Sequence, residues 1–252
     1  MSGHSKWSTI KRKKGAADAK RGQLFTRLAR EISIAARQGG GDPDSNFRLR
    51  IAIDRARANN MPKDNIERAI QLGTGEGKDG AIILEEVMYE GYGPHGIAML
   101  IECVTDNRNR AVAEIRHTLT RFGGSMGETG SVGWQFDRVA YFSFPVADHD
   151  EDQILELAVE SGADDVTFDD GTVEIIGQID YFKTINDQLD AAKIETDEAG
   201  LRMFPTNEIE LNPSDTAQVL RVIEALEELE DVQNVYSNLH ISDEALVELE
   251  AV

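Results

Sequence analysis

Hydrophobic residues in the first third of the chain recur at the spacing of an amphipathic helix. Residues 22–38 place a set of apolar side chains on one helical face, namely Leu24, Leu28, Ile32 and Ala35. Three glycines follow, and glycine readily adopts the left-handed conformation that closes helices. The pair Asp42-Pro43 predicts the start of a second helix, and a third is predicted from Pro62 to Gly73. The pattern therefore predicts a small helical bundle.

The period changes after the glycine-rich segment 73–80, whose composition predicts a flexible linker. Residues 84–89 and 97–104 have the apolar character of strands, and 107–122 predict an amphipathic helix capped by an aspartate or asparagine. A loop with several glycines then covers 123–133. This part of the chain has the order ββα.

Residues 139–205 alternate between strand and helix patterns in the order βαββαβ, which is that of the ferredoxin-like motif. The following segment, 208–236, adds a βαβ pattern. The segments on either side of 139–205 would each make an incomplete sheet alone. We therefore expect four strands to combine in one sheet, those at 84–89, 97–104, 208–211 and 232–236.

The predicted fold class is α+β, with a helical N-terminal bundle followed by two α+β domains, the third inserted into the second. Four parts are expected. They are 1–78 for a basic arm and the bundle, 79–136 with 206–240 for the discontinuous domain, 137–205 for the inserted domain, and 241–252 for a C-terminal tail.

Charge is distributed unevenly along this chain. The net charge is −20, yet residues 1–38 hold ten Lys or Arg and two acidic residues, whereas 146–252 hold four basic and 29 acidic residues. Such asymmetry indicates a polyanion-binding end. No apolar run approaches the ~20 residues that span a bilayer, and the first residues lack a secretory signal pattern. We therefore expect a cytosolic protein without a membrane partner.

The basic arm carries the strongest functional signal. Four cations stand on consecutive residues at 11–14, and a segment of this kind binds nucleic acid by releasing condensed counterions. Trp7 lies within the cluster, where it can stack on an unpaired base. The alternatives are a solubilising tail or, in a eukaryotic host, a targeting segment. Arg27, Arg30 and Arg37 of the first predicted helix either extend this phosphate-binding surface or form an ordinary solvated helix face. The predicted nucleic-acid-binding residues are Lys6, Trp7, Lys11, Arg12, Lys13, Lys14, Lys20, Arg21, Arg27, Arg30 and Arg37.

A second polar motif lies where a predicted strand passes into a helix at 106–110. Backbone N–H groups at a helix N-terminus, together with arginines, can bind an anion or an acidic partner. The alternative is helix capping with surface ion pairs, and the spacing does not decide between the two. The residues of this secondary anion or partner site are Asn107, Arg108, Asn109 and Arg110.

Other motifs do not support catalysis or a cofactor. Residues 91–96 spell G-x-G-x-x-G, but a strand pattern follows where a dinucleotide site needs a helix. The acids at 148–152 lack the glycine and glutamate of a calcium loop. The five histidines are scattered, and the single cysteine, Cys103, lies in an apolar strand pattern that predicts a core position. We expect no catalytic residues, no metal, no cofactor and no enzymatic activity.

Several ordered motifs resemble those of the YebC/PmpR family over nearly the whole chain. They are Gly3-His4-Ser5-Lys6-Trp7, Ala19-Lys20-Arg21-Gly22, Gly39-Gly40-Gly41-Asp42-Pro43, Arg48-Leu49-Arg50, Asn59-Asn60-Met61, Glu90-Gly91-Tyr92-Gly93-Pro94, Ile101-Glu102-Cys103 and Thr105-Asp106-Asn107-Arg108-Asn109-Arg110. The resemblance implies a helical N-terminal domain and two α+β domains, the third within the second. One departure is Phe47, where the family pattern implies proline.

The resemblance implies a transcriptional regulator, while mitochondrial relatives are translational activators of cytochrome oxidase and some members associate with ribosomes. Together with the charge pattern, it predicts a nucleic-acid-binding regulator of gene expression, acting on promoter DNA as a transcriptional regulatory protein. The alternative is a translation factor that contacts ribosomal RNA. The absence of a recognisable helix-turn-helix dimer favours this alternative.

An enzyme working in a cleft between the second and third domains is a third hypothesis. The acidic domains stay free for a protein partner, and the oligomeric state is left open.

Overall fold

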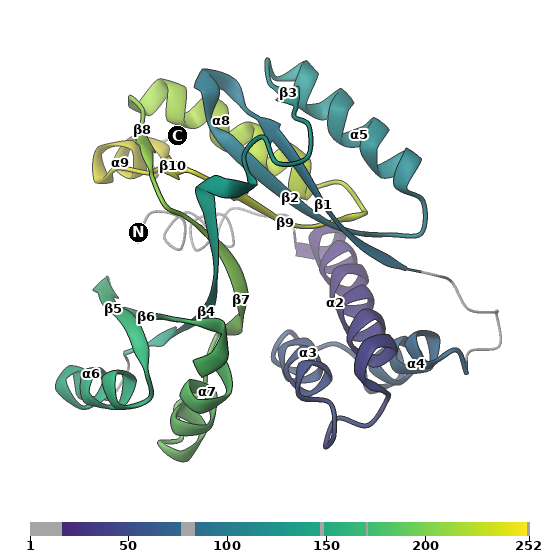
Figure 1. Ribbon diagram of the computed structural model, residues 1–252, viewed down its shortest axis with the longest axis vertical. Helices are drawn as coiled ribbons and strands as arrows, with labels where there is room; N and C mark the ends of the chain where they lie inside the picture. Colours follow the sequence, from purple (N-terminus) through teal and green to yellow (C-terminus); the bar gives the residue numbers. More distant parts are fainter. Residues whose placement is uncertain (1–16, 77–83, 147–148, 170, 251–252) are drawn as a thin grey trace. The chain divides into compact units, whose positions relative to one another are not determined.

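The computed structural model describes residues 17–76, 84–146, 149–169 and 171–250 (Figure 1). The expected α+β class is confirmed. The described residues form two compact units, one from Phe136 to Phe204 and the other from the chain on either side of it. We call them the inserted unit and the first unit. No helix among the described residues is both long and apolar enough to cross a membrane.

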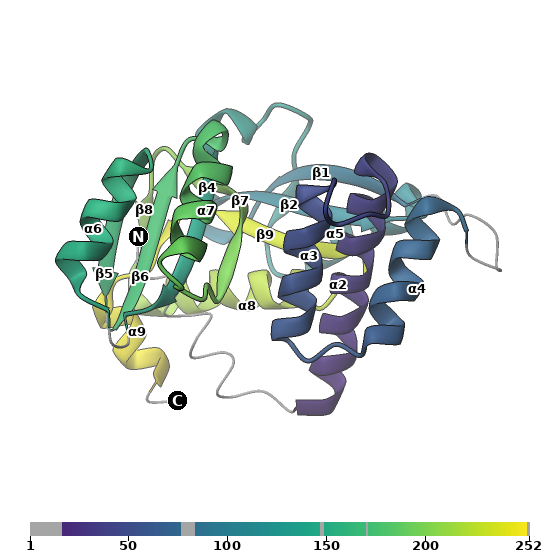
Figure 2. The ribbon, with the colours of Figure 1, turned by 90° about the horizontal axis from the view of Figure 1, so that it is seen from below.

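Three helices of the first unit form the expected bundle. They are α2 (Ala17–Gly39), α3 (Phe47–Ala58) and α4 (Lys63–Thr74). Helix α2 lies between the other two (Figure 2), and its buried Leu28, Ile32 and Ala35 pack against apolar residues of both. Close approach of α4 to α2 requires glycine at 73, because a Cβ there would lie 2.2 Å from the carbonyl oxygen of Ser33. The apolar residues predicted to share one face of this helix are thus buried in the core of the bundle.

Helix α3 starts four residues later than the Asp42-Pro43 pair predicted. Asn46 is its N-cap, and the side-chain oxygen accepts a hydrogen bond from the backbone N–H of Leu49 at 3.1 Å. The amide nitrogen of the same side chain donates to the carbonyl oxygen of Ala35 at 2.8 Å. Asp42 instead lies in a turn, where its carbonyl oxygen accepts from the N–H of Asn46. The start of the helix is set by Asn46, because its side chain is held by the bond to Ala35 of α2. Phe47 is the first helical residue, the position that proline favours in other helices.

The first unit also contains a four-stranded antiparallel sheet in the order β3-β1-β2-β9. The strands are β1 (Glu85–Tyr92), β2 (Ala98–Thr105), β3 (Ser125–Met126) and β9 (Val232–Ser237). Buried residues of β2 pack against α5 (Arg108–Arg121) and α8 (Pro213–Glu227), two helices that lie side by side (Figure 1). A strand, not a helix, follows the glycine motif at 91–96, where η1 (Pro94–Gly96) makes the turn.

The prediction for the fourth strand of this sheet was wrong. The segment predicted at 208–211 forms β8 (Ile209–Glu210), which pairs in parallel with β10 (Leu239–His240) in a separate two-stranded sheet. The fourth strand is β3, within the glycine-rich segment predicted as a loop. Residues predicted as a C-terminal tail include α9 (Asp243–Glu250), whose Ala245 and Leu246 are buried against α8.

The inserted unit has the predicted βαββαβ order. Its elements are β4 (Phe136–Pro145), α6 (Glu151–Glu160), β5 (Ala163–Asp169), β6 (Thr172–Gly177), η3 (Ile179–Tyr181), α7 (Phe182–Ala191) and β7 (Glu198–Pro205). The sheet order is β5-β6-β4-β7. Strands β4 and β5, which α6 connects, are parallel, and β6 lies antiparallel between them. Phe142 stacks on Phe182 of α7 with ring centroids 4.8 Å apart, which fixes one helix on the sheet.

Candidate nucleic-acid interface

Most of the predicted basic arm lies outside the described residues. This applies to Lys6, Trp7, Lys11, Arg12, Lys13 and Lys14. Lys20 lies in the first turns of α2, and Arg21 follows it with an exposed side chain. The guanidinium of Arg21 lies over the ring of Phe25, 5.4 Å from its centroid. The nucleic-acid contacts of the arm stay a prediction.

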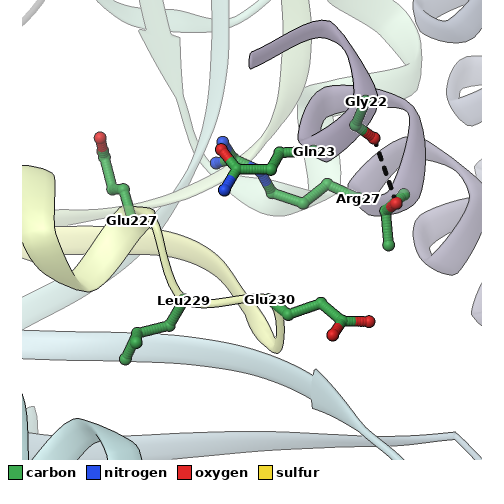
Figure 3. A pocket seen from close by; sticks show the side chains of 7 residues that line it. Gly22, Gln23, Arg27, Glu227, Leu229 and Glu230 are labelled. Atoms are coloured by element: carbon green, nitrogen blue, oxygen red, sulfur yellow. Dashed lines mark hydrogen bonds between the residues drawn. The ribbon is translucent and has the colours of Figure 1, made fainter. Parts of the chain in front are cut away.

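The next arginine of α2, Arg27, faces the acidic end of α8. It lines a cavity of about 330 Å³ together with Gln23, Glu227 and Glu230 (Figure 3). Burial lowers the pKa of Arg27, and the nearby Arg55 lowers it further, while the carboxylate of Glu227 acts in the opposite direction. Because two carboxylates line the cavity beside one guanidinium, the cavity does not favour an anionic ligand.

Arg30 is bound more tightly to the same acidic segment. Its guanidinium contacts the carboxylate of Asp231 at 3.0 Å and that of Glu230 at 2.8 Å. The two carboxylates differ sharply in environment, since the side chain of Asp231 is 2% exposed and that of Glu230 71%. The sequence analysis predicted that Arg30 lies on a phosphate-binding face. In the described structure its partners are two carboxylates of the same unit.

Arg37, near the end of α2, donates a hydrogen bond to the carbonyl oxygen of Leu84 at 2.8 Å, just before β1. On α3, Arg48 forms an ion pair with Glu86 of β1. These bonds join the helical bundle to the start of the sheet. Any phosphate contact of Arg30 or Arg37 therefore competes with an intramolecular acceptor.

The motif at 106–110 caps a helix and forms ion pairs. The side chain of Asn107 accepts a hydrogen bond from the backbone N–H of Arg110 at 3.1 Å, at the N-terminus of α5. Arg108 pairs with Glu85, and Arg110 pairs with Asp106 and Asp231, each at 2.8 Å. Hydrogen bonds to these two aspartates raise the pKa of Arg110. Asn109 is exposed. The arrangement matches the capping alternative, and anion binding by these residues stays a prediction.

Asp231 binds the arginines of both predicted sites, and the sequence analysis did not single it out. Its carboxylate accepts hydrogen bonds from Arg110 and, at 3.0 Å, from the hydroxyl of Thr105, besides pairing with Arg30. Its backbone oxygen accepts from the N–H of Val104 at 2.9 Å. One buried carboxylate thus joins α2, β2 and α5. The only signal in the sequence is that Asp231 directly precedes an apolar strand pattern.

The glycine-rich segment after α5 contains a second feature without a sequence prediction. The carboxylate of Glu90 accepts hydrogen bonds from the backbone N–H groups of Gly130, Val132 and Gly133 at 2.7–2.8 Å. Burial acts to raise the pKa of Glu90, but these hydrogen bonds outweigh it and lower the pKa. The ordered loop presents Trp134, whose side chain is 72% exposed.

The described residues contain no cluster of three or more His, Cys, Asp or Glu side chains placed to bind a metal.

Cys103 is buried, as its strand pattern predicted. Burial, together with the charges of Asp231 and Glu102, raises the pKa of its thiol to about 12. A thiol in this state is protonated at neutral pH and is a poor nucleophile.

Two family models together match most of the sequence. The model of the TACO1/YebC N-terminal domain matches residues 5–76, and the model of the TACO1/YebC second and third domain matches residues 84–239. The chain belongs to the TACO1/YebC family. The resemblance found in the motifs is thereby confirmed.

Curated relatives of this TACO1/YebC-family chain are similar over their full length. A probable transcriptional regulatory protein of Desulfatibacillum aliphaticivorans is 51% identical over 248 residues, which cover 98% of this chain and 100% of the relative. Another with the same name, from Acidithiobacillus ferrooxidans, is 52% identical and covers 100% of this chain and 99% of its own. The shared name supports a regulatory role, and it is not the name of an enzyme.

The fold is also similar to a solved structure, the crystal structure of a conserved hypothetical protein from Aquifex aeolicus. The TM-score is 0.82 at 38% sequence identity, and the match covers 90% of this chain and 93% of the other. That protein's name assigns it no activity, so the likeness supports the fold and adds nothing about the target.

Proposed function

We propose that this TACO1/YebC-family protein is a nucleic-acid-binding regulator of gene expression whose N-terminal arm, with Lys20 and Arg21 near the start of α2, contacts phosphates. The observation that carries the proposal is the separation of charge, with ten basic and two acidic residues in 1–38 of a chain whose net charge is −20. A polyanion is attracted to one end and repelled by the rest. The screening length at physiological salt is about 8 Å, so each end acts locally.

The contacts that two α2 arginines make with other segments reduce the number of cations that are available to bind phosphate. Because Arg30 and Arg37 already bind acceptors in the first unit, the phosphate contacts fall chiefly to the four consecutive cations at 11–14, with Lys20 and Arg21 beside them. Each phosphate that a cation neutralises releases condensed counterions, so these contacts should depend strongly on salt.

RNA is the second candidate target, and the surface of α4 favours it over promoter DNA. Helices α3 and α4 are joined by four residues, a spacing that occurs in helix-turn-helix motifs. The exposed side of α4 carries Asp64 and Glu67 beside Lys63 and Arg68, so it has no net positive charge, and Glu67 lies 3.5 Å from Lys63. Carboxylates on a recognition helix would face the phosphate-lined major groove. A ribosome-associated translation factor that contacts ribosomal RNA needs no such helix.

A salt titration tests the arm. Replacing Lys11, Arg12, Lys13 and Lys14 by Gln should weaken binding to every nucleic acid and flatten the slope of log K against log salt by up to about 3–4, since each duplex phosphate contact contributes ~0.9. The matched control replaces Lys63, Arg68, Lys183 and Lys193 by Gln, which changes the net charge equally. Equal slopes for the two variants would contradict the proposal.

The choice between the two targets needs a separate measurement. Crosslinking in cells followed by sequencing should recover RNA from the wild-type protein and little from the arm variant. Recovery of promoter DNA in place of ribosomal RNA would refute the translation hypothesis and leave the role of the arm intact.

A further inference from the structure

Helix α6 of the inserted unit carries an apolar stripe that no described element covers. Ile154 and Ala158 are buried against the sheet, where α6 lies across β5 (Figure 1). Leu155 and Val159 lie one position further round the helix and are 44% and 64% exposed. They are one turn apart, so their side chains are neighbours on the helix surface.

A third exposed side chain, from η3, lies at the end of α6. Gly162 follows Ser161, the C-cap of α6, and its N–H donates to the carbonyl oxygen of Val159 at 3.2 Å. The ring of Tyr181 covers this glycine so closely that a Cβ there would lie 2.5 Å from the ring. Tyr181 is itself 44% exposed. The ring of Tyr181 thus lies at the end of the helix that carries Leu155 and Val159, and we call these three exposed side chains the α6 stripe.

Exposed carboxylates lie on the same helix as the α6 stripe, in a unit that is strongly acidic. Residues 136–204 contain 18 acidic and four basic residues. Glu151, Glu156 and Glu160 on α6 are exposed and form no ion pair with any described residue. Two of the four cations are already paired, Lys183 with Asp187 and Arg202 with Glu198. The negative potential at this surface is thus uncompensated.

Exposed apolar side chains next to unpaired carboxylates favour a partner that is both apolar and basic. Apolar side chains that are exposed together cost free energy in water and are typical of interaction sites. A nucleic acid or an anionic membrane would be repelled by these carboxylates. We propose that the α6 stripe docks an amphipathic segment of a partner protein, with Leu-like side chains on the stripe and lysines or arginines against the glutamates of α6. The site is separate from the basic arm and does not depend on the proposed nucleic-acid function.

A fluorescence-anisotropy titration of the full-length protein tests the proposal, with a labelled helical peptide of alternating leucine and lysine faces as the probe. Val159→Ser should weaken binding on the order of tenfold, the effect of losing one well-buried aliphatic contact. The matched control is Val247→Ser. Val247 is 67% exposed on α9, another acidic helix, and lies outside the stripe. Both substitutions are at exposed positions, and equal thermal stability of the variants confirms that folding is unchanged.

Three results would overturn the proposal. In the first, Val159→Ser and Val247→Ser weaken binding equally, so the stripe has no special role. In the second, a lysine peptide with serines in place of leucines binds as tightly, so charge alone attracts it. In the third, the variant with Gln at 11–14 binds the peptide more tightly than wild type, so the occupant is the chain's own basic arm. Weakening by Val159→Ser alone, with dependence on the leucines, supports a docking site.

Discussion

Removing the charge of Asp231 is the most direct test of how the bundle is held to the sheet. Asp231→Asn keeps the shape of the side chain but replaces one acceptor oxygen by a donor NH₂ group. That group would face the guanidinium of Arg30 at 3.0 Å or that of Arg110 at 2.8 Å. Both guanidinium groups have only donors, so one of these contacts becomes repulsive.

The expected cost follows from burial. Removing one member of a fully buried ion pair costs about 3–5 kcal/mol. The side chain of Arg30 is 12% exposed, but that of Arg110 is 40% exposed and keeps Asp106 as a partner. We therefore expect Asp231→Asn to reduce the free energy of unfolding of the first unit by about 3 kcal/mol, at the lower end of that range.

The neighbouring Glu230 provides the matched control. It contacts the same Arg30 at 2.8 Å, but its side chain is 71% exposed. An exposed ion pair contributes about 0–1 kcal/mol, so Glu230→Gln should have little effect. The two substitutions thus each remove one carboxylate charge from the same arginine. They differ in burial and in the further bonds of Asp231 to Arg110 and Thr105.

Native-state hydrogen exchange measures the effect for each segment, because the exchange of a protected amide reports the free energy of local opening. The N–H of Val104, bound to the backbone oxygen of Asp231, and the amides of α5 should lose protection in Asp231→Asn. Amides of 136–204 should not. Equal losses of protection in Asp231→Asn and Glu230→Gln would refute the argument that the buried carboxylate holds these segments together.

Two further predictions concern Glu90 and Cys103. Glu90→Gln should reduce the stability of the loop at 130–134 by about 1–3 kcal/mol, since hydrogen bonds from three backbone N–H groups to a charge are lost. Because the pKa of Glu90 is lowered in the folded state, its contribution is present above the ordinary carboxyl pKa and disappears as the pH falls through the lowered value. Fluorescence of Trp134 in a Trp7→Phe background, recorded against pH, should show an acid transition in the wild type and none in Glu90→Gln; the same transition in both would contradict the assignment. Cys103, buried with a pKa of about 12, should react with a thiol reagent near pH 8 only as the first unit unfolds, and rapid labelling of the native protein would show that the site is open.

Periodicity predicted the helices and strands because burial of one face is a local property of the sequence. Leu28, Ile32 and Ala35 recur at the spacing of α2 and are buried in the bundle. The same kind of argument placed Cys103 in the core. The start of α3 and the partner of β8 were predicted wrongly, because both depend on contacts with distant segments. Asn46 bonds to Ala35, and β8 pairs with a strand that follows it by about thirty residues.

Charge shows the same division. The sequence by itself determined the separation of a basic forepart from acidic domains, since charge is counted residue by residue, and it determined the family through ordered motifs. Only the tertiary structure decided which charges are already used. Arg30 and Arg110 were predicted as anion-binding residues, but both bind the buried Asp231. The physical reason is that an ion pair forms between residues that folding brings within a few ångströms, and the distances between residues 30, 110 and 231 are set by the packing of the bundle and α5 against the sheet.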